Sequence, residues 1–113
     1  MSAASNNVMI PLPSQEFLES LIQKGGKHEP IIIIRFTATW CGPCKRIDMD
    51  FLLSLSDKIK WYECDLDEND YTPGYCGVRK IPAFMAIVNG SPQPIFQCSD
   101  TMKVAEWIKG GFK

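Results

Sequence analysis

The segment from Ile31 to Thr37 is the part of the sequence that most constrains the fold. It opens with four consecutive isoleucines, and an apolar, β-branched run of this length is typical of a strand covered on both faces. A turn containing Gly42 and Pro43 follows, and apolar residues then recur at helical spacing, which predicts a helix to about Asp57. A buried strand that leads directly into a helix indicates an α/β domain with helices on the faces of a sheet.

The other expected elements come from the same patterns of apolar spacing, caps and turns. They are a short strand over 8–12, a helix from the N-cap Ser14 to about Lys24 that Gly25-Gly26 stops, and a strand from Pro30 onward. Further strands are expected over 59–66, 83–88 and 95–98, with a polar stretch containing Pro73 and Gly74 after the first of them. Ser99 or Asp100 caps a last helix, which Gly110-Gly111 ends. Asn89-Gly90 is a strong hairpin signal between the last two strands. The order β-α-β-α-β-α-β-β-α predicts a mixed sheet of about five strands with about four flanking helices. The early strands should be parallel and the final hairpin antiparallel.

Length and charge limit the classes of protein to which the chain can belong. Its 113 residues suit one domain, which we expect over 8–113 after a flexible head over 1–7. Twelve basic and thirteen acidic residues give a net charge of -1, so neither nucleic acid nor membrane is an expected partner. The first seven residues lack the pattern of a secretory signal, and we expect a cytoplasmic location.

One close pair stands out among the five cysteines, which are Cys41, Cys44, Cys64, Cys76 and Cys98. An odd number argues against a disulfide framework and favours a reducing compartment. The strand-to-helix turn places Cys41 at the start of a helix, where free N–H groups and the helix dipole favour a thiolate. We therefore expect Cys41 to attack a disulfide and Cys44, three residues on, to resolve the mixed disulfide. The alternatives are two ordinary buried cysteines or a zinc site. A zinc site needs four ligands, whereas His28 and the other cysteines are scattered, so no metal is expected.

The run from Phe36 to Lys45, which contains Trp-Cys-Gly-Pro-Cys, resembles the active-site signature of thioredoxins, and Ile81-Pro82 resembles the cis-proline step of that family. The resemblance extends from about Val8 to Lys109. It implies the thioredoxin fold, the reduction of protein disulfides, and a redox-active disulfide with no bound cofactor. It also implies recharging by a thioredoxin reductase that uses NADPH. A monomer that takes part in cell redox homeostasis and electron transport is expected.

The resemblance also assigns supporting residues. It implies that the peptide before Pro82 is cis, lies against the cysteine pair, and has backbone beside it that pairs with the substrate chain. From the sequence alone, a trans proline that opens a strand is the simpler interpretation. We expect Trp40 to pack beside the dithiol as part of the docking surface, the alternative being a core aromatic.

The clearest departure from the family is Arg35, which stands six residues before Cys41 where a buried aspartate is usual. A buried arginine needs a partner, and Glu63 lies on the neighbouring strand by the family's alignment. Our hypothesis is an ion pair between Arg35 and Glu63 beneath Cys44, in which Arg35 favours the thiolate by charge and Glu63 relays a proton. The alternative is that Arg35 extends outward to solvent and takes no part in the chemistry.

Smaller departures concern the helix after the site and the single cysteines. Met49 replaces a proline that kinks the helix of the family, so a straighter helix is expected. Cys98, near a position that is commonly glycine, and Cys76 are candidate regulatory thiols, with ordinary structural roles as the alternative. Cys64 is most simply a strand residue.

Two functions other than a disulfide reductase are also compatible with the sequence. One is a thioredoxin-like binding module with little or no redox turnover, and the other is an oxidising or isomerising variant. Three basic residues, Lys45, Arg46 and Lys80, either form a basic rim that favours acidic partners or are ordinary solvated surface.

Overall fold

The computed structural model describes residues 8–23, 31–69 and 71–112. The expected flexible head over 1–7, the helix stop at Gly25-Gly26 and the strand opening at Pro30 lie outside these residues, as does His28.

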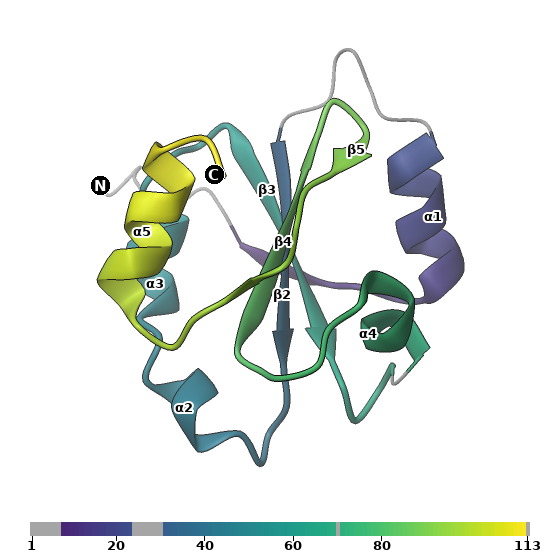
Figure 1. Cartoon of the computed structure of the whole chain (residues 1–113), viewed down its shortest axis with the longest axis horizontal. Coiled ribbons are helices and arrows are strands. Elements are labelled where there is room, and N and C mark those ends of the chain that lie inside the picture. Colours follow the sequence, from purple (N-terminus) through teal and green to yellow (C-terminus); the bar gives the residue numbers. More distant parts are fainter. Residues whose placement is uncertain (1–7, 24–30, 70, 113) are drawn as a thin grey trace.

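Among the described residues, six strands form a mixed sheet at the centre of the fold (Figure 1). Its strands are β1 Met9–Pro11, β2 Ile31–Thr37, β3 Ile59–Asp65, β4 Ala83–Val88, β5 Ser91–Pro92 and β6 Phe96–Gln97. The spatial order is β1-β3-β2-β4-β5, and β6 also pairs with β4. β3 is parallel to both β1 and β2, whereas β4 is antiparallel to β2, β5 and β6. The predicted mixed sheet, with early parallel strands and a late antiparallel hairpin, is confirmed.

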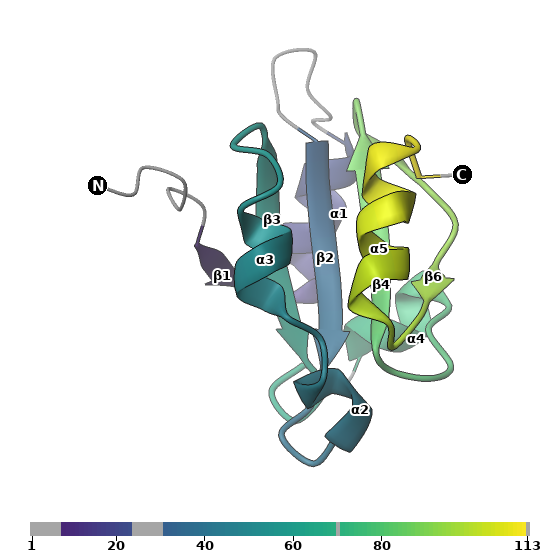
Figure 2. The same ribbon diagram turned by 90° about the vertical axis from the view of Figure 1, so that its left-hand side faces the viewer.

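Helices cover both faces of the sheet (Figure 2). They are α1 Gln15–Gln23, α2 Gly42–Lys45, α3 Met49–Leu53, α4 Tyr71–Cys76 and α5 Thr101–Lys109. Helices α1 and α4 lie on one face and α3 and α5 on the other, while α2 sits beyond the end of β2. No helix within the described ranges is long and apolar enough to cross a membrane.

Alternation along β2 divides the core into two halves. Ile33 packs with Trp61 and Trp107 on the side of α3 and α5, whereas Ile32 and Ile34 pack with the side chains on the side of α1 and α4. Successive strand residues point to opposite faces, so a strand with helices on both sides must be apolar throughout. This explains the run of isoleucines.

The helix after the cysteine pair differs from the single, straighter helix expected to about Asp57. It is broken into α2 and α3, with Arg46 as the C-cap of the first part and Asp48 as the N-cap of the second. The Asp48 carboxylate accepts a hydrogen bond from the N–H of Phe51 at 3.1 Å. An N-cap aspartate competes with continuation of the helix, so the break does not require a proline at Met49.

The partner strand of the final hairpin is also shorter than the expected 95–98. The turn is where Asn89-Gly90 places it, with positive φ angles of 54° and 79°, as a two-residue hairpin turn requires. Two short strands, β5 and β6, then pair with opposite ends of β4. Pro92 ends β5 opposite Ile87, and Pro94 lies between β5 and β6. A proline lacks the N–H that a continuous ladder needs.

Candidate active site

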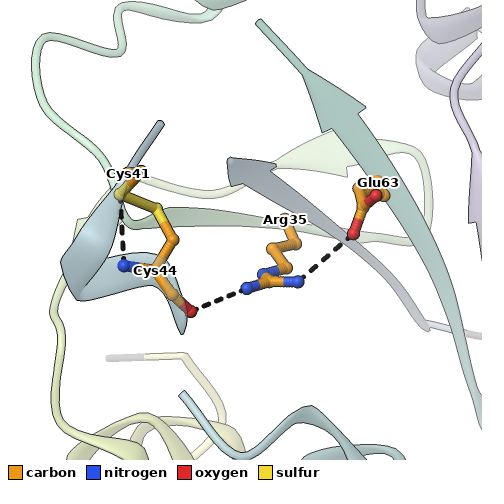
Figure 3. The surroundings of a disulfide bond; sticks show 4 residues. All are labelled: Arg35, Cys41, Cys44 and Glu63. Atoms are coloured by element: carbon orange, nitrogen blue, oxygen red, sulfur yellow. Dashed lines mark hydrogen bonds and ion pairs between the residues drawn. A yellow bond between two sulfur atoms is a disulfide. The ribbon is translucent and has the colours of Figure 1, made fainter. Parts of the chain in front are cut away.

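Cys41 and Cys44 form a disulfide at the end of β2, with their Cα atoms 5.3 Å apart (Figure 3). Cys41 is the N-cap of α2, and the N–H of Cys44 donates to its Sγ at 3.1 Å. Cys41 is 4 % exposed and Cys44 1 %, so the two residues differ little in exposure. The N–H bond to the Cys41 sulfur points a donor at the atom that carries negative charge after reduction.

Gly42 and Pro43 lie exposed between the two cysteines. Pro43 stands in the first turn of α2, where its missing N–H is harmless. The backbone of Gly42 is not left-handed, and a Cβ there would meet nothing within 4 Å. The turn therefore does not require glycine for its own geometry. Its effect is to leave the solvent side of the dithiol open.

Trp40 is 66 % exposed beside the dithiol, which rules out the alternative of a core aromatic. Its Nε1 donates to Asp67 Oδ1 at 3.1 Å, and the hydroxyl of Thr39 donates to Asp67 Oδ2 at 3.0 Å. One carboxylate thus fixes both residues that precede Cys41. The result is a large apolar ring held in place on the surface, as docking a partner requires.

Pro82 follows a cis peptide bond and is buried, as the resemblance implies. Ile81 packs against Cys41 and Cys44, and the carbonyl of Pro82 accepts the N–H of Cys98 at 3.2 Å. A hollow of about 320 Å³ adjoins this segment, lined by Trp40, Leu66, Val78, Arg79, Lys80 and Ile81. The dithiol therefore lies beside an apolar hollow with cationic side chains in its lining.

Arg35 and Glu63 form the ion pair that the sequence suggests, with Nη1 and Oε1 3.2 Å apart. They are direct neighbours in the parallel register of β2 and β3. The other terminal nitrogen of Arg35, Nη2, donates to the carbonyl oxygen of Cys44 at 2.9 Å (Figure 3). The Arg35 side chain is 13 % exposed, so the alternative of an arginine extending into solvent does not hold. Burial lowers the pKa of Arg35, while the charge of Glu63 opposes that shift.

The three remaining cysteines are free thiols. Cys64 is buried, and desolvation together with the neighbouring charges of Cys76, Asp65 and Glu63 raises its pKa to about 12. Burial also raises the pKa of Cys76 to about 11, so its thiolate is scarce at neutral pH and its regulatory role stays a prediction. Cys98 is partly buried beside Asp100, whose N–H reaches its sulfur at 3.4 Å.

The buried thiol of Cys64 predicts a loss of stability in alkali. Its pKa rises from 9.0 to about 12 in the folded chain, so above pH 9 the unfolded chain binds fewer protons than the folded one and stability falls as pH rises. At pH 10 the loss from this thiol is about 1 kcal/mol. Urea unfolding at pH 7 and pH 10 measures it, and Cys64→Ala should show a drop smaller by about that amount. Equal drops in both proteins would contradict the prediction.

The three residues of the candidate basic rim, Lys45, Arg46 and Lys80, are all exposed, as both interpretations require. Among the described residues, no three His, Cys, Asp or Glu side chains gather as a metal site would require.

Sequence reasoning missed two contacts of the site. The hydrogen bonds of Asp67 to Thr39 and Trp40 join residues more than 25 positions apart, and no local sequence pattern predicts them.

The N-cap Asp48 was also missed, although it has a local signal, since Asp50 lies in the first turn of the helix that follows. Asp48 also donates its N–H to the hydroxyl of Thr101 at 3.0 Å, which connects the start of α3 to the start of α5.

Comparison with known proteins matches the chain to the Thioredoxin family model over residues 8–110. A thioredoxin of Gallus gallus is 36 % identical over 84 residues, which are 72 % of this chain and 79 % of that protein. The M-type chloroplastic thioredoxin of Brassica napus is 39 % identical, but the match spans only 46 % of its length. The chain likewise spans 33 % of the chloroplastic thioredoxin M2 of Arabidopsis thaliana.

Solved structures agree with the sequence comparison. The thioredoxin of Fasciola hepatica superposes with a TM-score of 0.78 at 27 % identity and covers 90 % of this chain and 98 % of its own. That of Malassezia sympodialis gives 0.81 at 25 % identity, over 100 % of this chain and 98 % of its own. With a family match over nearly the whole length and a disulfide at the strand-to-helix turn, this chain belongs to the thioredoxin family of thiol–disulfide oxidoreductases.

Proposed function

We propose that this chain is a protein disulfide reductase. The observation that carries the proposal is the Cys41–Cys44 disulfide beside the exposed ring of Trp40. A pure binding module has no chemical need for two sulfurs at bonding distance. The adjoining hollow beside Ile81 offers apolar surface on which a partner chain can rest while its disulfide meets the sulfurs.

The reaction follows from the two sulfurs. In the reduced protein, the Cys41 thiolate attacks one sulfur of the substrate disulfide, an S–S bond forms between them, and the other substrate sulfur leaves as a thiolate. The Cys44 thiolate then attacks the Cys41 sulfur, which restores the Cys41–Cys44 disulfide and releases the second substrate thiolate. Two electrons pass to the substrate, and both products take protons from solvent.

Finer aspects of the function are proposed on family membership. A thioredoxin reductase that draws electrons from NADPH returns the disulfide to the dithiol, the chain works as a monomer, and its place is the cytoplasm. The three free thiols suit a reducing compartment. Consumption of NADPH by a thioredoxin reductase, dependent on this chain and on a disulfide substrate, tests the first of these points.

Reduction of insulin disulfides, with dithiothreitol as the electron donor, tests the central proposal. We expect the chain to hasten precipitation of the insulin B chain at micromolar concentration, and the double variant with Cys41→Ser and Cys44→Ser to give the uncatalysed rate. Rates equal to that of the double variant would remove the reductase and leave the binding module. A dithiol potential well above about -200 mV would favour the oxidising or isomerising variant.

A further inference from the structure

Arg35 occupies an unusual place for an arginine, because it lies on the inner side of a central strand. It follows Ile33 by two residues in β2, so both side chains point to the face covered by α3 and α5. Its neighbours in register are Glu63 on β3 and the buried Phe84 on β4. A cation in this position is costly unless its charge is used or fully matched.

The charge of Arg35 is only partly matched. Arg35 makes an ion pair with Glu63 and donates a hydrogen bond to the carbonyl oxygen of Cys44. Its Nε is buried and has no hydrogen-bond partner among the described residues. The Glu63 side chain is 34 % exposed, against 13 % for Arg35, so solvent screens the carboxylate more than the guanidinium. A net positive potential therefore remains on the side of the pair that faces Cys44.

Figure 3 shows the order of the groups from Glu63 through Arg35 to Cys44. The guanidinium lies between the carboxylate and the cysteine, and a guanidinium does not release its protons in a protein. A proton relay from Glu63 to the Cys44 sulfur has no carrier along this line. Glu63 is better placed to anchor Arg35 than to move a proton.

We propose that Arg35, anchored by Glu63, is a positioning residue that holds Cys44 by its carbonyl and tunes the dithiol by its buried charge. Reduction adds two electrons to the Cys41–Cys44 bond and leaves two sulfurs that carry negative charge until they are protonated. A fixed cation bonded to the carbonyl of Cys44 stabilises that reduced form more than the neutral disulfide. The chain is therefore more oxidising than the same chain without the charge. The inference rests on the redox couple of the proposed function.

Equilibration with reduced and oxidised glutathione at pH 7.0 tests the proposal. The fraction of Cys41–Cys44 disulfide is read by mass after acid quenching and alkylation. We expect Arg35→Met, which removes the charge and keeps an unbranched chain, to shift the equilibrium constant about tenfold toward the disulfide, or about 30 mV. Arg35→Lys should restore most of the wild-type constant.

Two further variants separate charge from structure. Glu63→Gln removes the opposing charge, so its equilibrium constant should move toward the dithiol, opposite to Arg35→Met. Arg46→Met removes an exposed cation two residues from Cys44, and solvent screening should limit its effect to about twofold or less.

An unchanged constant in Arg35→Met, or shifts of the same sign in Arg35→Met and Glu63→Gln, would overturn the proposal. Circular dichroism checks that each variant is folded. If Arg35→Met does not fold, the sign of the shift in Glu63→Gln decides the question. The equilibrium constant between the Cys41–Cys44 couple and glutathione can be measured whether or not the chain reduces insulin. Failure of the wild type to reduce insulin therefore counts against the proposed function and not against this inference.

Discussion

Replacing Cys44 with serine is expected to abolish turnover and to trap the chain on its substrate. Cys41 keeps its place as the N-cap of α2 and can still attack a disulfide. With no second sulfur in the chain's own pair, the mixed disulfide can be resolved only when an external thiol attacks it. Because an intramolecular thiol acts at an effective concentration far above that of an added one, we expect insulin reduction to fall by about a thousandfold or more. Non-reducing electrophoresis should show a covalent adduct with the substrate.

Cys41→Ser is the matched control for this experiment. It leaves Cys44, which lies inside α2 and not at its N-cap, as the only sulfur of the pair, so it should lose turnover without forming the adduct. The two serine variants together assign the roles of the sulfurs. Adduct from Cys41→Ser and none from Cys44→Ser would reverse that assignment.

The parts of the site that were predictable from the sequence are those fixed by short-range patterns. Cys41 and Cys44 lie three residues apart on a turn between a β-branched strand and a helical pattern, and local rules place both. The contact between Arg35 and Glu63 joins residues 28 positions apart. It was predicted from the family's alignment, which places Glu63 on the neighbouring strand, and the parallel register of β2 and β3 makes the two residues direct partners.

The parts that were not predictable depend on competition between local signals or on tertiary contact. At Asp48, helix periodicity on both sides favoured one continuous helix, but the side-chain bond to the N–H of Phe51 ends one helix and begins another. After Asn89-Gly90, the hairpin signal favoured one partner strand over 95–98, whereas two short strands form, β5 and β6, with Pro94 between them. Periodicity reports which face is buried and does not report where the hydrogen-bond ladder stops.

The largest expected effect on stability is that of Trp107→Ala. Trp107 is 5 % exposed and stands in α5 at the centre of an aromatic cluster. Its ring stacks on Phe96 with centroids 4.9 Å apart and meets Phe112 edge-on at 5.0 Å and Phe84 at 6.3 Å. Removing a buried tryptophan leaves a cavity and breaks these ring contacts, so we expect a loss of about 3–5 kcal/mol in the free energy of unfolding.

The cluster also has a role in holding the end of the chain. Phe112 has a φ of 70°, which is uncommon for a residue with a side chain. Its N–H donates to the carbonyl of Trp107 at 2.9 Å, and its ring is buried against that of Trp107. The packing of the two rings therefore offsets the strained backbone, and loss of the indole should release this segment together with the end of α5.

Urea unfolding followed by circular dichroism measures the effect of Trp107→Ala, and Met102→Ala is its control on the same helix. Met102 is 57 % exposed, so its truncation should change the free energy of unfolding by about 0.5 kcal/mol or less. The contrast tests burial and not helix propensity, because both positions gain the same alanine in α5. A loss below about 1 kcal/mol in the free energy of unfolding of Trp107→Ala would mean that α5 stays packed on the sheet without the indole. In that case other contacts would hold α5 in position, such as the hydrogen bond from the N–H of Asp48 to the hydroxyl of Thr101.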